Sequence, residues 1–197
     1  MKNLTTLLLA LILLFSCVSL AETAEITSDE YLAATESQWF ATGKVDYVIH
    51  AMMVTADTPV YNPYEDVDYV AKPDGIDVIM KGSGGECYVS KLAKVVKNYT
   101  DPDGAKLTAA YFTPDTWMPV KTIPTSGCFA CYIPLETKVS VQTAWGDLLH
   151  ANRDGVPHGK GDYLVCYAGQ DGQPDLSDVW VVNGEIFATT YDLTNAQ

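Results

Sequence analysis

The residues best suited to chemistry lie in one polar stretch, residues 145–162. It contains His150 and His158, two of the three histidines of the chain, and Arg153, its only arginine. A histidine transfers protons near neutral pH, and an arginine binds a carboxylate or a phosphate. The stretch therefore predicts a hydrolytic or anion-binding site whose candidate residues are His150, Arg153, His158 and Asp162.

The same stretch also fits a second interpretation. Its glycines and charged residues are typical of a solvated connection between strands, which is the usual role of a polar loop. In the catalytic interpretation, Asp147 or Asp162 would orient a histidine ring. We favour the connection on that ground. The sequence also contains neither a serine-centred nucleophile motif nor a His-Glu-x-x-His motif.

Four cysteines follow residue 21, and an even number in an exported chain indicates disulfides with three possible pairings. A redox pair would need Cys128 at the start of a helix, whereas residues 127–134 have the composition of a strand. A zinc site would need a second closely spaced pair. We therefore expect structural disulfides or buried thiols, and neither a metal nor a cofactor. The disulfide candidates are Cys87, Cys128, Cys131 and Cys166.

Two groups of aspartates could supply oxygen ligands to calcium. They are Asp101 with Asp103, and Asp171 with Asp175 and Asp178. Neither group matches the twelve-residue calcium loop with its terminal glutamate, so we interpret them as turn-forming aspartates. The glycines of residues 82–85 are likewise interpreted as a hairpin turn.

The elements that must position these residues are mostly short strands. Thr27 and Glu30 have the spacing of a capping box, which predicts a helix from about Ser28 to Ala41. Ser90 could cap a second, short helix. Residues 58–63 are expected to form a loop. Short β-branched and aromatic runs predict strands at residues 45–54, 67–71, 76–80, 86–89, 117–123, 128–133, 138–145, 163–167, 179–182 and 187–191.

Many short strands with little helix predict a β-rich α+β fold. We expect an amino-terminal helix followed by two related small antiparallel β modules. The predicted division is a signal peptide at 1–21, the helix and first module at 22–100, connecting strands at 101–134 and the second module at 135–197.

The prediction of two related modules depends on a shared spacing. Each candidate segment begins with Asp and an apolar strand, continues through a glycine-rich turn, and ends in a strand with three spaced apolar residues. The intervals between those three residues are seven and four in both segments, which indicates an internal repeat. The matched residues are Tyr88, Val95 and Tyr99 in one segment, and Trp180, Phe187 and Tyr191 in the other.

Residues 161–165, 178–187 and 190–192 resemble a small module found in phage and bacterial proteins. That module reads Pro-Gly-Asp-Tyr, an aliphatic pair, a variable turn, a strand, and then Phe-x-x-Thr-Tyr-acid. Lys160 replaces the usual proline. The whole chain after residue 21 resembles secreted, uncharacterised proteins of Gram-positive bacteria. These resemblances imply a fold and carry no established activity.

The amino terminus has the layout of a secretory signal peptide. Lys2 precedes an apolar run at residues 7–15, and the small residues Ser19 and Ala21 predict cleavage after Ala21. The run is shorter than the roughly 20 residues of a membrane span, which disfavours an uncleaved anchor. Residues 14–17 also resemble a bacterial lipobox, in which Cys17 would be acylated, although Phe15 fits that pattern poorly.

Composition excludes some partners. The first 21 residues carry one lysine and no acid, so their removal changes the formal net charge from −13 to −14. A chain this acidic repels nucleic acid and anionic membranes. We expect a secreted or cell-surface protein, non-enzymatic, that binds an unknown extracellular ligand or protein, or has a structural role. The alternative is a small secreted hydrolase or anion-binding enzyme that uses residues 150–158.

Overall fold

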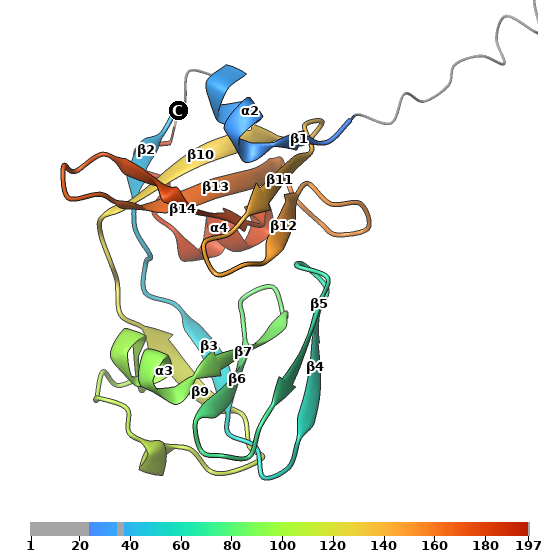
Figure 1. Cartoon of the computed structure of the whole chain (residues 1–197). Coiled ribbons are helices and arrows are strands. Elements are labelled where there is room, and N and C mark those ends of the chain that lie inside the picture. The colour runs from blue at the N-terminus through green and yellow to red at the C-terminus, as the bar shows by residue number, and fades with distance from the viewer. Residues whose placement is uncertain (1–23, 35–37, 197) are drawn as a thin grey trace, which may run out of the picture.

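The computed structural model describes residues 24–34 and 38–196. The predicted signal peptide, its cleavage site and Cys17 lie outside these residues. Figure 1 shows two lobes joined by two strand connections. We call them the terminal lobe, residues 24–34, 38–44 and 124–196, and the inserted lobe, residues 45–123.

The terminal lobe contains an antiparallel sheet of order β14-β13-β10-β2, covered on one face by a smaller sheet of order β1-β11-β12. The short helix α2 packs beside the smaller sheet, and α4 covers the opposite face of the larger sheet (Figure 1). Its elements are β1 (Ile26–Thr27), α2 (Ser28–Ala34), β2 (Phe40–Thr42), β10 (Cys128–Pro134), β11 (Val139–Gln142), β12 (Leu148–Ala151), β13 (Gly161–Ala168), β14 (Pro174–Val182) and α4 (Gly184–Thr190).

The inserted lobe contains a five-stranded antiparallel sheet of order β7-β6-β3-β9-β8 and the separate hairpin β4-β5. Helix α3 packs on one face of this sheet and the hairpin on the other. Its elements are β3 (Val48–Met52), β4 (Thr58–Asn62), β5 (Val67–Ala71), β6 (Asp77–Lys81), β7 (Cys87–Lys91), α3 (Leu92–Asn98), β8 (Tyr99–Thr100), the 3-10 helix η1 (Ala109–Tyr111) and β9 (Met118–Thr122).

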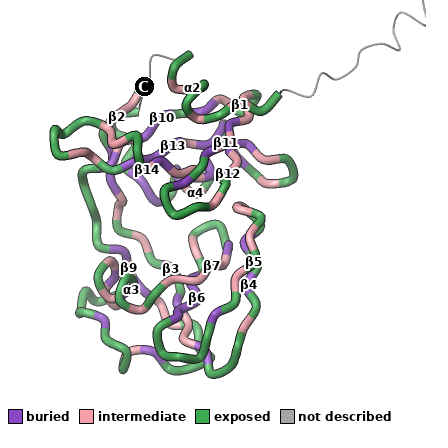
Figure 2. Tube along the Cα trace, in the orientation of Figure 1, coloured by how far each residue is buried: buried purple, intermediate pink, exposed green. Residues whose placement is uncertain are grey.

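Each lobe has its own core, seen as purple segments in Figure 2, and each has an inner strand that is buried on both faces, β13 in the terminal lobe and β6 in the inserted lobe. In β13, Leu164 and Cys166 face the smaller sheet, while Val165 faces α4. In β6, Ile79 faces the β4-β5 hairpin, while Met80 faces α3. This double burial explains why these strands are apolar without alternation.

The two larger sheets have the same order of elements. In each, a hairpin is followed by a seven-residue helix, and the hairpin lies beside a central strand that pairs with one further strand. The strand registers also correspond. One row of paired residues reads Tyr88, Met80, Ala51, Met118 in the inserted lobe and Trp180, Val165, Ala130, Phe40 in the terminal lobe. Beyond these rows, Tyr99 pairs with Thr122, and Tyr191 pairs with Lys44.

The chain crosses between the lobes twice, and the two crossings lie side by side. The Thr125 N–H donates to the Lys44 carbonyl at 3.0 Å, and the Thr122 N–H donates to the Tyr47 carbonyl at 3.0 Å. Gly43 has no space for a side chain, because an added Cβ would lie 1.8 Å from the Thr125 carbonyl oxygen. The crossings therefore tie the lobes together at their backbone.

The predicted β-rich α+β class is confirmed. The three-part division stays a prediction about domains, although strand pairing crosses its boundaries. Two strands of the first predicted module pair with strands outside it. Strand β2 pairs with β10 of the connecting segment, and β1 pairs with β11 of the last module. The connecting segment 101–134 contributes β9 to one lobe and β10 to the other.

Some element predictions were wrong. The capping box forms as expected, because the Glu30 N–H donates to Thr27 Oγ1 at 3.2 Å and the Thr27 N–H donates to Glu30 Oε2 at 2.8 Å. The helix predicted to reach Ala41 does not, because residues 40–42 are strand β2 and pair with β10. Residues 58–62 form strand β4 rather than a loop.

The predicted strand at residues 187–191 is also wrong, since residues 184–190 form helix α4. Asn183 caps this helix by accepting from the Glu185 N–H at 3.1 Å and the Ile186 N–H at 3.4 Å. The side chain of Phe187 then packs between Tyr163 and Tyr191, with ring centroids 3.9 and 4.6 Å away. Capping and packing outweigh the strand preference of these aromatic and β-branched residues.

The predicted disulfides are absent, because the four described cysteines are free thiols. Cys128 and Cys131 lie on opposite faces of β10, one toward α4 and the other toward the smaller sheet. Cys87 lies in the inserted lobe, so no partner faces it. Three of the four thiols are buried and pack as small apolar side chains.

Candidate functional site

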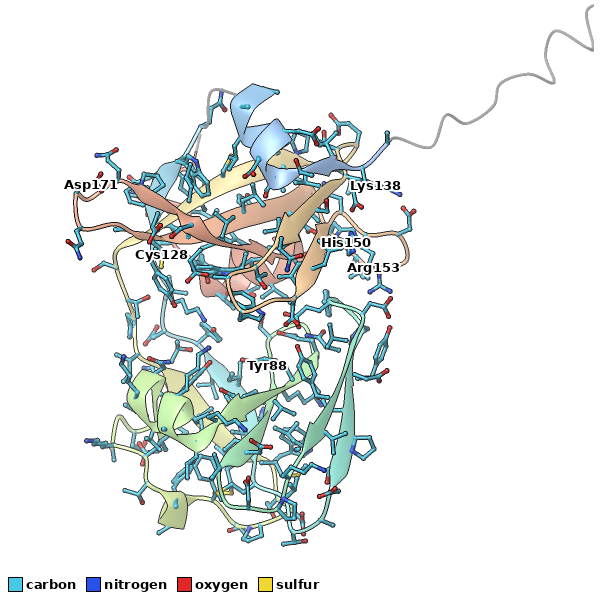
Figure 3. The ribbon with its side chains drawn as sticks, in the orientation of Figure 1. Tyr88, Cys128, Lys138, His150, Arg153 and Asp171 are labelled. Carbon is cyan, nitrogen blue, oxygen red and sulfur yellow. The ribbon has the colours of Figure 1, made fainter. Side chains whose placement is uncertain are left out.

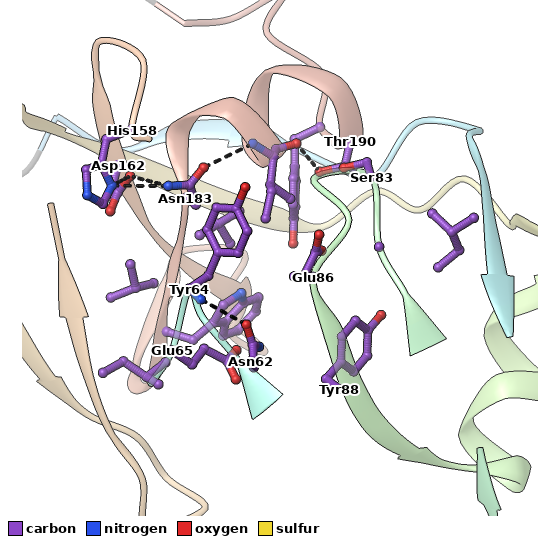
Figure 4. A pocket seen from close by; sticks show the side chains of 18 of the residues that line it. Asn62, Tyr64, Glu65, Ser83, Glu86, Tyr88, His158, Asp162, Asn183 and Thr190 are labelled. Atoms are coloured by element: carbon purple, nitrogen blue, oxygen red, sulfur yellow. Dashed lines mark hydrogen bonds and ion pairs between the residues drawn. The ribbon is translucent and has the colours of Figure 1, made fainter. Parts of the chain in front are cut away.

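A cavity of about 220 Å³ lies between the two lobes (Figure 4). The inserted lobe contributes the tips of its two hairpins, residues 62–65 and 82–86, and the adjoining strands. The terminal lobe contributes the end of β14 and the start of α4, and Lys44 and Tyr47 come from the first crossing. Leu149, His150, His158 and Asp162 add a fifth segment, so five segments far apart in sequence build one site between two lobes, a common position for ligand binding.

Glu86 is the most unusual side chain in this cavity. It is only 9% exposed, and its Oε2 is buried without a hydrogen-bond partner. Burial raises the pKa of the Glu86 carboxyl, hydrogen bonds from the backbone N–H groups of Glu86 and Gly84 oppose that shift, and the Glu65 carboxylate adds to it. A buried carboxyl without a cationic partner is destabilising, which is frequent at functional sites.

The turn that holds Glu86 is shaped for this arrangement. Residues 82–86 close the β6-β7 hairpin, as predicted, with the Gly82 N–H donating to the Glu86 carbonyl at 2.8 Å. The Glu86 carboxylate folds back over Gly82, where an added Cβ would lie 1.8 Å from its Oε1. Gly82 is therefore required for the position of the carboxylate.

Two more charged groups in the cavity have displaced pKa values. Burial raises the pKa of Glu65, although the Tyr69 hydroxyl donates to its Oε2 at 2.9 Å. Burial lowers the pKa of Lys44, and Lys94 lowers it further. The Lys44 Nζ lies 5.8 Å from the Tyr191 ring centroid, an arrangement typical of a cation–π contact.

Aromatic side chains form much of the remaining wall. Tyr47 and Tyr88 line the cavity, and the hydroxyl group of Tyr99 behind them is hydrogen-bonded to both; burial raises the pKa of all three. Figure 3 shows Tyr88 on the side of the inserted lobe that faces the terminal lobe. Tyr64 and Trp180 also line the cavity. The cavity thus combines aromatic surface with a few polar groups, as small-molecule sites do.

The structure brings together His158 and Asp162, two of the four predicted catalytic residues. The His158 Nδ1 lies 3.0 Å from Asp162 Oδ1, and the His158 Nε2 bonds to the Arg153 carbonyl. Asn183 Nδ2 also lies 3.1 Å from the His158 Nδ1. Both ring nitrogens therefore have partners within the protein, and neither is left to take a proton from a substrate.

Asp162 is 2% exposed, and backbone N–H groups bind both of its carboxylate oxygens. Its Oδ2 accepts from the Asn152 N–H at 2.7 Å, and its Oδ1 accepts from the Gly184 N–H at 2.8 Å. These bonds tie the end of β12 to the start of α4. The geometry is that of a structural anchor rather than a catalytic carboxylate.

The other two candidates have separate contacts. The His150 Nδ1 lies 2.7 Å from Glu25 Oε1 at the edge formed by β12 (Figure 3). Arg153 reaches from the terminal lobe to the β4-β5 hairpin tip, with 3.1 Å to the Pro63 carbonyl and 3.0 Å to Asp66 Oδ2. Arg153 therefore joins the lobes, and His150 and Arg153 both line a second, shallower hollow.

The turn interpretation is confirmed for Asp101, Asp103 and Asp171 and is wrong for Asp175 and Asp178, which lie in strand β14. The Asp101 carboxylate accepts from the Ala105 N–H at 2.7 Å, and the Asp171 carboxylate accepts from the Gln173 N–H at 3.0 Å. Among residues 24–34 and 38–196, no group of three or more His, Cys, Asp or Glu side chains could hold a metal ion. In the same ranges, no helix has the length and apolar character needed to cross a membrane.

Comparisons with protein-family models, with curated proteins and with solved structures gave no match to this chain. The resemblance of the carboxyl-terminal part to a phage and bacterial module therefore stays a prediction. Function has to be inferred from the geometry of the cavity. Its central residues, Glu86, Glu65 and Lys44, were not among the sequence candidates.

Proposed function

We propose that this protein is a secreted, non-enzymatic binding module whose small ligand occupies the cavity between the two lobes. The observation that carries the proposal is a cavity between the lobes that gathers Lys44, Glu65 and Glu86 against aromatic side chains, with the Glu86 Oε2 buried and without a hydrogen-bond partner. Groups of this kind, gathered in an aromatic-lined cavity, are typical of ligand sites. The amino-terminal sequence supports export.

The alternative is a small hydrolase that uses His150, Arg153, His158 and Asp162. In its favour, His150, His158 and Asp162 all line the cavity. Against it, the ring nitrogens of His158 are bound to Asp162 and to a backbone carbonyl. Arg153 is paired with Asp66. A general base needs a free nitrogen, which His158 lacks, so the binding function fits the arrangement of His158 and Arg153 better.

We further infer that the two lobes descend from one duplicated unit whose first strands have been exchanged. In chain order β2 leads into β3, yet β2 pairs with β10; likewise β9 leads into β10, yet β9 pairs with β3. The matching registers and the helix after each hairpin support this origin. On this view Asp77 corresponds to Asp162, and both carboxylates accept a backbone N–H from the residue after the neighbouring hairpin strand.

The duplication bears on function because it assigns Asp162 a structural role. Asp77 Oδ2 accepts from the Lys72 N–H at 3.0 Å, just as Asp162 Oδ2 accepts from the Asn152 N–H at 2.7 Å. Asp77 has no histidine beside it, and it is bound instead by the Lys91 ammonium. An anchor present in both lobes needs no catalytic explanation.

The binding function is tested by blocking the cavity. The Ile186 side chain lines it, and Ile186→Trp would fill it; Ile76→Trp, at a position that is 53% exposed and outside the cavity, is the matched control. Unfolding temperatures are measured with panels of amines, carboxylates, sugars and phosphates, and hydrolysis with chromogenic esters. We expect at least one class to stabilise the wild type and the control but not Ile186→Trp. Ester hydrolysis that is lost in His158→Asn, or the absence of any stabilising class, would refute the proposal.

A further inference from the structure

We propose that the ligand of this cavity carries a primary ammonium group and that Glu86 is its counter-ion. This inference rests on the proposed binding function and names the chemistry of the ligand. It starts from the Glu86 Oε2, a buried acceptor without a donor in a side chain that is 9% exposed. Because the terminal torsion of a glutamate is soft, this oxygen can turn toward a donor in the cavity.

The electric field near Glu86 favours a cation. The Glu65 carboxylate lies close enough to raise the pKa of Glu86, and no ion pair involves either glutamate among the described residues. The Lys44 ammonium lines the same cavity but lies over the Tyr191 ring. Two unpaired carboxylates in a partly desolvated site are costly, and a bound cation would stabilise both.

The kind of cation follows from the missing donor. A primary ammonium group presents three N–H donors, whereas a quaternary ammonium group presents none. Only the first can satisfy the Glu86 Oε2 by a charge-assisted hydrogen bond. Figure 4 shows Glu86 between Tyr64 and the turn that carries Ser83, with Tyr88 nearby. These aromatic side chains would contact the apolar part of an alkylammonium ligand.

Two substitutions separate the charge of Glu86 from its position. Glu86→Gln removes the charge and keeps the shape. Gly82→Ala keeps the charge but places a methyl group where the carboxylate now lies, 1.8 Å from Oε1, so the flexible side chain must move. Gly82 does not need a positive φ, so alanine fits its backbone. Glu136→Gln, an exposed glutamate outside the cavity, is the matched control for the charge.

The test is calorimetric titration of the mature chain at constant salt and pH 7.5. The probes are n-butylammonium, its neutral analogue 1-butanol, butyrate, tetramethylammonium and Ca²⁺. We expect n-butylammonium to bind most tightly to the wild type and to Glu136→Gln. We expect Glu86→Gln and Gly82→Ala to bind it about tenfold or more weakly, the effect of losing one charge-assisted hydrogen bond.

Each other result has a defined meaning. Equal binding of n-butylammonium by the wild type and Glu86→Gln would overturn the role of Glu86. Preference for tetramethylammonium, 1-butanol, butyrate or Ca²⁺ would overturn the ammonium ligand. If one of those probes binds and Ile186→Trp blocks it, the cavity is a binding site of another class and the proposed function stands. If n-butylammonium and every compound of the wider panel fail to bind, both proposals fall.

Discussion

At the scale of single residues, the buried carboxylates of this chain are of two kinds. Asp77 and Asp162 have a partner at each oxygen, from backbone N–H groups and from a cationic or histidine side chain. Glu86 has a buried oxygen with none. The first kind stabilises the fold, and the second costs stability. A costly group is retained when it is needed for function, as the trade-off between stability and activity predicts.

The thiols give a prediction at this scale. Burial raises the pKa of Cys131 to about 11 and that of Cys166 to about 12. Because the thiolate is the reactive form, we expect iodoacetamide at pH 8 to modify the half-buried Cys87 first. Cys131 and Cys166 should react only near pH 11 or after unfolding. Quantitative mass spectrometry of alkylated peptides measures the order.

The sign of the pH effect on stability follows from the same pKa values. The folded thiols have higher pKa values than an unfolded cysteine, which titrates near about 8.5. Their contribution to stability is therefore present below pH 8.5 and is lost as the pH rises toward 11. If all four thiols of the native protein react at the rate of free cysteine, the buried positions assigned to them are wrong.

At the scale of elements, the Asp77 and Asp162 carboxylates each link the start of one β-hairpin to the end of the hairpin that precedes it in the sequence. Asp→Asn at either position turns an NH₂ group toward at least one N–H donor. We expect the free energy of unfolding to fall by about 1–3 kcal/mol in Asp77→Asn and by about 3 kcal/mol in Asp162→Asn. The larger effect is expected for Asp162 because its carboxylate has more buried partners. Urea unfolding measures both changes.

Asp103→Asn is the control for these substitutions, since Asp103 is exposed in a turn and its change should be within about 0.5 kcal/mol. Measuring both stability and activity in these variants also separates the binding function from the hydrolase function. A catalytic Asp162 would lose activity on substitution while keeping its stability. Unchanged stability of Asp162→Asn would therefore contradict the anchor and revive the hydrolase.

Local sequence signals predicted elements where local chemistry decides them. The capping box of Thr27 and Glu30 and the turn of residues 82–86 are examples. The sequence misassigned residues 187–191 because their composition favours a strand, whereas the Asn183 cap and the packing of Phe187 favour a helix. Residues 40–42 became a strand because β10 lies beside them. Such tertiary effects outweigh propensity.

At the scale of the whole molecule, the candidate site could not be predicted from spacing. Lys44, Glu65, Glu86 and Trp180 come from four distant segments, and only the docking of the two lobes brings them together. The lobes are held by the paired crossings, by Arg153 with Asp66, and by Ser83 with Thr189 at 3.1 Å. The polar stretch that drew attention in the sequence supplies one of these contacts, through Arg153.

The effect of Glu86 on the stability of the protein depends on pH, because only the ionised carboxylate is destabilising. Its folded pKa is above the unfolded value of about 4.3, so ionised Glu86 destabilises the protein at neutral pH and does not do so near pH 3.5. Glu86→Gln should therefore be more stable than the wild type at pH 7.5, by roughly 1 kcal/mol or 2–4 °C, and equal to it at pH 3.5. The other ionisable groups that line the cavity are Lys44, Tyr47, Tyr64, Glu65, Tyr88, His150, His158, Asp162 and Tyr191.

The most direct measurement is the unfolding temperature of the wild type and of Glu86→Gln at pH 7.5, with and without n-butylammonium. Without the amine, the variant should unfold at the higher temperature. At ten times the wild-type dissociation constant, the amine should stabilise the wild type by about 1.4 kcal/mol and the variant by about 0.4 kcal/mol or less, which removes the stability advantage of the variant. A wild type that is more stable than the variant without the amine, or equal stabilisation of both by the amine, would contradict the account.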